Sequence, residues 1–71
     1  MSEDYVIMDG RMIRHRRWKL GVTQGELARK VGVSIDTIAK FEVSSAAISL
    51  ELLKKIADAQ GVNVEYYLHN T

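Results

Sequence analysis

The feature that most constrains the fold is a pair of helix-start signals separated by a single glycine stop. Residues 23–26 have the sequence TQGE, a capping box in which a threonine hydroxyl and a glutamate carboxylate each satisfy a backbone amide. Gly32 follows where a left-handed residue ends helices, and Ser34 can cap a second helix two residues later. This spacing predicts two short helices joined by a turn of about three residues, a helix-turn-helix over about residues 23–42.

Helical periodicity continues on both sides of this unit. Asp9 can cap a helix over about residues 10–20, and Ser49 can cap a fourth helix. A last short helix can begin at Asn63. Together with the central pair, these segments predict an all-α domain of five helices over residues 9–69.

Two segments lack this periodicity. Residues 1–8 form an arm with a small apolar patch at Tyr5, Val6 and Ile7, and this arm is either disordered or paired as a strand with a partner. Residues 43–48 are expected to form an uncharged loop. In neither segment do apolar and polar residues alternate strongly enough to indicate a β-strand and so to compete with the all-α prediction.

Composition excludes several other classes of protein. The 71 residues include no cysteine, which excludes a disulfide scaffold and a thiolate metal site. No apolar run approaches the roughly 18 residues of a membrane helix, and the acidic N-terminus does not resemble a signal peptide. These features predict one soluble domain without a membrane partner, in a cytoplasmic setting.

The inventory of reactive side chains argues against an enzyme. His15 and His69 stand near opposite ends of the chain, and neither has a cysteine or a pair of carboxylates at metal-binding or acid–base spacing. No phosphate-binding glycine motif is present. We therefore expect no catalytic site, no metal and no cofactor.

The central block resembles the helix-turn-helix of the phage repressor and Cro type, the lambda-repressor-like or XRE family. The matching residues are VTQGELARKVGVS at 22–34, TIAKFE at 37–42 and LLKKIADAQGV at 52–62. The resemblance covers about residues 9–69. It implies a five-helix domain whose recognition helix, about residues 34–43, enters the major groove of duplex DNA.

The resemblance also implies positions for DNA contacts. The base-reading positions are Ile35, Asp36, Thr37 and Lys40. The phosphate-contacting positions are Thr23, Gln24, Ser34, Arg17, Ser44 and Ser45. By their chemistry, Lys40 can donate to guanine, Asp36 can accept from cytosine, and Ile35 can pack on a thymine methyl. The alternative for each is a solvated surface side chain.

In the family that this chain resembles, an arginine late in the first helix pairs with the glutamate that ends the recognition helix. Arg17 and Glu42 occupy the matching positions. The resemblance thus implies a structural ion pair that locks the first helix to the third. Arg17 is also a candidate to reach a phosphate.

Charge is nearly balanced, with ten Lys and Arg against nine Asp and Glu, which is unusual for a nucleic-acid binder. The positive residues cluster in the first two predicted helices, at Arg11, Arg14, Arg16, Arg17, Lys19, Arg29 and Lys30. This clustering predicts a locally basic surface, and its alternative is a solvated helix face. The uncharged loop and Asp36 predict weak DNA binding that depends on a dimer.

These observations predict a sequence-specific transcriptional regulator of prokaryotic or phage type, nucleoid-associated when bound. It would bind a palindromic operator as a homodimer and be controlled by its concentration. The candidate dimer contacts are Val64, Tyr66, Tyr67, Leu68, Met12, Trp18 and the apolar arm, with Tyr67 and Leu68 also suited to the core. The alternative is a protein-interaction module of the same fold, an antitoxin or antirepressor that holds a protein partner.

Overall fold

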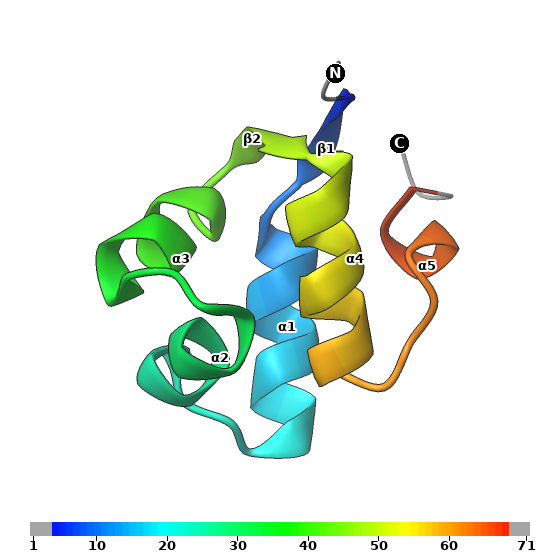
Figure 1. The fold of residues 1–71 in the computed structure, drawn as a ribbon. Helices are drawn as coiled ribbons and strands as arrows, with labels where there is room; N and C mark the ends of the chain where they lie inside the picture. The colour runs from blue at the N-terminus through cyan, green and yellow to red at the C-terminus, as the bar shows by residue number, and fades with distance from the viewer. Residues whose placement is uncertain (1–3, 69–71) are drawn as a thin grey trace.

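The computed structural model describes residues 4–68, which form five helices and two short strands (Figure 1). In chain order the elements are β1 (Tyr5–Asp9), α1 (Arg11–Leu20), α2 (Gln24–Val31), α3 (Ile35–Phe41), β2 (Ser45–Ser49), α4 (Leu50–Ala59) and α5 (Glu65–Leu68). The pair α2 and α3 lies on one side of α1 and α4, and α5 lies on the other side (Figure 1). The helix-turn-helix and the C-terminal helix therefore occupy opposite sides of the domain.

Side-chain caps fix where the helices begin. The Thr23 hydroxyl accepts a hydrogen bond from the Glu26 amide at 3.0 Å, and the Glu26 carboxylate accepts from the Thr23 amide at 2.8 Å. Ser34 and Ser49 cap α3 and α4 through their hydroxyls. Gly32 ends α2 with a φ of 79°, in the left-handed region that favours glycine. These are the two central helices and the connecting turn that the sequence predicts.

The prediction of an all-α fold is wrong in one respect, because β1 and β2 form a small antiparallel sheet that places Ile7 opposite Ala47. Alternate residues face inward, so Met8, Ala46 and Ile48 are buried. The N-terminal arm therefore pairs within its own chain, and the predicted loop is its partner strand. Two strands are marginal alone, so this sheet depends on packing against the helices.

The chain turns from β1 into α1 at Gly10, where there is no room for a side chain. A Cβ atom at Gly10 would lie 1.5 Å from the carbonyl oxygen of Phe41, and the Gly10 amide donates to the carbonyl of Ser44 at 2.9 Å. The backbone angles at Gly10 suit any residue, so the restriction is purely steric. The sequence placed the cap of this helix at Asp9. The structure instead has Gly10 at that position, while the Asp9 carboxylate accepts from the Arg11 amide at 3.0 Å.

The apolar core lies between the helices and beneath the sheet. Its buried members are Met8, Ile13, Leu27, Ala28, Val31, Ile38, Ile48, Leu53, Ile56, Ala57 and Tyr67. They come from both strands and all five helices described, so burial ties each element to the others. Within residues 4–68, no helix has the length and apolar character needed to cross a membrane.

A buried polar network holds α5 against the rest of the domain. Tyr67 is fully buried and donates its hydroxyl hydrogen bond to the Gln60 side-chain oxygen. The Gln60 amide nitrogen donates in turn to the carbonyl of Ile13 at 3.3 Å. Burial raises the pKa of the Tyr67 phenol above its ordinary value, so it remains a donor. The helix begins at Glu65, two residues after the predicted start at Asn63.

Candidate nucleic-acid interface

One side of α3, from its first turn to its last, presents a mixed edge to solvent. Ile35 is 53% exposed, and Asp36 and Lys40 are exposed one helical turn apart. Thr37 is half-buried, and its hydroxyl lies 2.9 Å from the hydroxyl of Ser34. This edge thus carries an apolar side chain, a hydrogen-bond acceptor and a hydrogen-bond donor close together.

Arg17 and Glu42 join α1 to the end of α3. The Nε and Nη2 atoms of Arg17 donate to the two carboxylate oxygens of Glu42 at 2.9 and 2.8 Å, and Nη1 donates to the Val22 carbonyl at 3.0 Å. The side chains of the pair are only 8% and 2% exposed. Gln24, at the start of α2, donates to the same carboxylate at 3.0 Å. One buried cluster therefore fixes α3 relative to both α1 and α2.

The same cluster limits two of the phosphate contacts implied by the resemblance. All three guanidinium nitrogens of Arg17 donate within the protein and its side chain is buried, so the structure presents Arg17 as a structural residue. Gln24 is half-buried, with one bond to Glu42. An amide nitrogen carries two hydrogens, so Gln24 retains a second donor for another acceptor.

The capping hydroxyls at the starts of α2 and α3 are exposed. Thr23 and Ser34 each accept an amide hydrogen bond from their own helix. The Ser34 hydroxyl also lies 2.9 Å from the Thr37 hydroxyl, so one of these two hydroxyls donates to the other. The backbone and hydroxyl hydrogen bonds from Thr23 also hold the pKa of Glu26 below its ordinary value, so the carboxylate of the capping box stays ionised to a lower pH than that of a free glutamate.

The segment after α3 is exposed and uncharged. Val43 is 69% exposed, and Ser44 and Ser45 are exposed beside it. The hydrogen bond from Gly10 to the carbonyl of Ser44 anchors this segment to the start of α1. The structure therefore places both serines next to the C-terminal end of α3.

The basic residues of α1 do not form one surface with α3. Arg17 lies inside the domain, and Arg16 donates to the carbonyl of Gln60 at 3.2 Å. The guanidinium of Arg14 lies 5.0 Å from the centre of the Trp18 ring, in a hollow that α1 shares with α5. Part of the positive charge that the sequence concentrates in this helix thus lies beside α5, and α5 is on the other side of α1 from α3 (Figure 1).

The predicted dimer residues in and beside α5 differ in exposure. Tyr67 is fully buried, so its prediction as a dimer contact is wrong: its ring fills the core of its own chain. Val64 and Leu68 are half-buried against the core, and Met12 of α1 is placed in the same way. Tyr66 is 37% exposed and remains on the surface.

The structure offers no metal centre within residues 4–68, because no three histidine, aspartate or glutamate side chains come together there. His15 is exposed on α1. His69 lies outside the described residues.

Comparison with known proteins assigns this geometry to a family. A family model described as helix-turn-helix matches residues 13–67. The chain belongs to the helix-turn-helix family. The match runs from α1 into α5, so it includes the turn between α2 and α3 and the buried Arg17–Glu42 pair. The resemblance to repressors of the XRE type is confirmed.

Relatives of this helix-turn-helix chain are named as transcriptional regulators. A regulator in the ATPase CF(0) region of Rhodospirillum rubrum is 40% identical over 58 residues, which cover 82% of the chain and 54% of that relative. An HTH-type regulator of Methanothermobacter thermautotrophicus is 46% identical over 70% of the chain and 72% of its own length. An HTH-type regulator of Archaeoglobus fulgidus is 45% identical over 75% of the chain and 76% of its own length. The chain thus spans about half of the Rhodospirillum protein.

A solved structure agrees with the fold. The clp gene regulator ClgR from Corynebacterium glutamicum superposes with a TM-score of 0.79 at 33% identity, over 84% of this chain and 64% of ClgR. The helix-turn-helix family and these relatives are regulators of transcription and not enzymes.

Proposed function

We propose that this helix-turn-helix chain binds duplex DNA sequence-specifically and regulates transcription as a homodimer on a palindromic operator. In this proposal α3 enters the major groove with its N-terminal turn against the bases. The observation that carries it is the exposed edge of α3 on a helix held in place by the buried Arg17–Glu42 pair. Holding α3 rigidly matters because the recognition of bases requires hydrogen-bond donors and acceptors at fixed positions.

The proposed base contacts follow from side-chain chemistry. Lys40 donates to the O6 or N7 atom of guanine, and Asp36 accepts from the N4 amino group of cytosine. Ile35 packs on the methyl group of thymine, with Thr37 beside it. The exposure of Ile35, Asp36 and Lys40 supports these roles.

The proposed phosphate contacts are mostly uncharged. The donors are Thr23, Gln24, Ser34, Ser44 and Ser45. The N-terminal end of α2 adds the positive end of a helix dipole. Uncharged donors release few counterions, so one chain is expected to bind weakly and two chains on one operator are needed for useful affinity.

One observation favours a second function, a protein-interaction module such as an antitoxin or antirepressor. Ile35 and Val43 are 53% and 69% exposed at the two ends of α3. Exposed apolar side chains of this size suit a protein partner as well as a thymine methyl.

A salt titration of binding to random duplex DNA separates these two functions. Each phosphate neutralised by a cation contributes about −0.9 to the slope of log affinity against log salt, so the regulator gives a shallow negative slope. Lys40→Glu is expected to weaken this binding, whereas Lys54→Glu on α4, with the same change in charge, is not. Absence of measurable binding at low salt would refute the regulator and favour the interaction module.

A further inference from the structure

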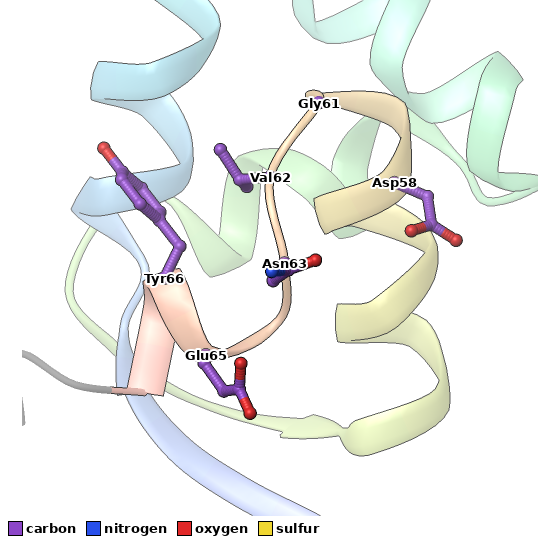
Figure 2. A pocket seen from close by; sticks show the side chains of 6 residues that line it. All are labelled: Asp58, Gly61, Val62, Asn63, Glu65 and Tyr66. Carbon is purple, nitrogen blue, oxygen red and sulfur yellow. The ribbon is translucent and has the colours of Figure 1, made fainter.

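Gly25 is the glycine whose presence the backbone does not explain. It is the second residue of α2, and within a helix glycine is less favourable than any residue except proline. Of the other four glycines, three have a positive φ, among them Gly61 after α4 (Figure 2), and Gly10 is fixed by its overlap with the Phe41 carbonyl. At Gly25 φ is not positive, and the atoms nearest to an added Cβ belong to side chains. The reason for this glycine therefore lies in its neighbours.

The space beside Gly25 is occupied by the end of the Ile35 side chain. A Cβ atom at Gly25 would lie 3.4 Å from Cδ1 of Ile35 and 3.9 Å from its Cγ1. Ile35 is the first residue of α3, so this contact joins the first turns of the two helices of the helix-turn-helix. One methyl group at Gly25 would just make van der Waals contact, whereas a larger branched side chain would compete with Ile35 for the same space.

The support beneath Ile35 is itself held in place. Gln24, next to Gly25, donates to the Glu42 carboxylate at 3.0 Å, and Thr23 caps the helix through the Glu26 amide at 3.0 Å. Ile35 therefore rests against a fixed turn of α2 while about half of its surface, 53%, stays exposed. An exposed side chain without such support loses rotamer freedom when it binds, so a fixed support favours binding.

We infer that Gly25 is a positioning residue that holds Ile35 against α2 for contact with the C5-methyl group of a thymine. The missing side chain at Gly25 lets Ile35 lie back against the helix and leaves its other side free for the base. A methyl contact has no hydrogen bond to fix its geometry, so its strength depends on the distance between the two apolar groups. The inference rests on the proposed function, because it specifies how one base contact of that function is held.

Replacement of thymine by deoxyuridine isolates this contact, because it removes only the C5-methyl group. Each thymine of a duplex selected by the wild-type protein is replaced singly, and the affinities of the two forms are compared by fluorescence anisotropy. The wild-type protein is expected to lose about fourfold in affinity per half-site at one thymine, the amount expected for one methyl group. Ile35→Ala is expected to bind the thymine and deoxyuridine forms equally at that position.

Substitutions at Gly25 then test the positioning role. Gly25→Val places two methyl groups beside Ile35 on a side chain that is stiff at χ1, and should lower the thymine-to-deoxyuridine affinity ratio below about twofold. Gly25→Ala, the matched control, adds one methyl group at contact distance and should keep the wild-type ratio. Both variants should melt no lower than wild type, because alanine and valine favour a helix more than glycine does. A merely structural role would change Tm and leave the ratio, so a wild-type ratio in Gly25→Val would overturn the inference.

The double variant Gly25→Val/Ile35→Ala shows whether Gly25 acts through Ile35. If it does, adding Gly25→Val to Ile35→Ala changes the affinity for the selected duplex by less than about twofold, because the side chain that it displaces is already gone. If Gly25→Val weakens Ile35→Ala severalfold, Gly25 meets the DNA directly and the positioning role is wrong. In the free protein, a nuclear Overhauser effect from the Gly25 α-protons to the δ1 methyl of Ile35 is expected, and its absence would also overturn the inference.

The inference and the proposed function fail in different ways. If the wild-type protein selects no duplex motif, the proposed function fails and the inference fails with it. If it selects a motif in which no thymine is sensitive to deoxyuridine, or if Gly25→Val keeps the wild-type ratio, the inference is wrong and sequence-specific DNA binding stands. A sensitive thymine whose effect is lost in both Ile35→Ala and Gly25→Val, and kept in Gly25→Ala, supports both.

Discussion

Replacing Glu42 by alanine is the sharpest test of how α3 is held. The substitution removes both hydrogen bonds from Arg17 and the bond from Gln24 in one step. It leaves the guanidinium of Arg17 buried beside α3 without its counter-charge. The expected result is a large loss of folding free energy with no direct change to any exposed residue of α3.

The magnitude follows from burial. Breaking a buried ion pair by removing one partner costs about 3–5 kcal/mol. For 71 residues, a total stability of about 4–11 kcal/mol is expected at 0.05–0.15 kcal/mol per residue. The variant is therefore expected near the limit of folding, with a Tm lowered by about 12 °C or more.

Thermal and urea unfolding followed by circular dichroism measure this loss. Arg11→Ala is the matched control, because it breaks the exposed Arg11–Asp9 pair and is expected to change Tm little. The double variant Arg17→Met/Glu42→Leu replaces both charges with apolar groups and should recover much of the stability. A Glu42→Ala Tm within about 3 °C of wild type would refute the reasoning.

Three further substitutions test other parts of the fold. Gly10→Ala should cost more than about 3 kcal/mol in urea unfolding, because its Cβ would overlap the Phe41 carbonyl and no side-chain rotation relieves the overlap; normal stability would contradict this packing. Tyr67→Phe should cost about 1–3 kcal/mol by leaving the Gln60 oxygen unsatisfied, and an unchanged Tm would contradict the buried bond. Because folding lowers the pKa of Glu26 from its ordinary value of 4.5, the stability that its carboxylate adds is complete above that value and is lost as pH falls through the lowered one. Glu26→Gln should flatten this acid limb of a stability–pH profile, and an unaltered limb would argue against the capping box.

The central helices could be predicted because their signals are local. Thr23, Glu26, Gly32 and Ser34 act on backbone groups within one turn of themselves, so residue type and spacing are enough to locate the helix ends. The resemblance added the Arg17–Glu42 pair, whose partners lie far apart in the sequence.

The sheet and the role of Gly10 could not be predicted in the same way. Residues 5–9 pair with residues 45–49, and neither segment is a convincing strand until the fold brings them together. Gly10 is constrained by the carbonyl of Phe41, a neighbour in space but not in sequence. From the sequence, Tyr67 suits either the core or a dimer interface. Its complete burial in the folded domain decides for the core.

The most direct test of the proposed function is selection of bound duplexes from a random pool by the wild-type protein and by Lys40→Ala. The account predicts a two-fold-related motif whose preference relaxes at one position in each half-site in the variant, by about 1–3 kcal/mol. Failure of the wild-type protein to enrich any motif would contradict it.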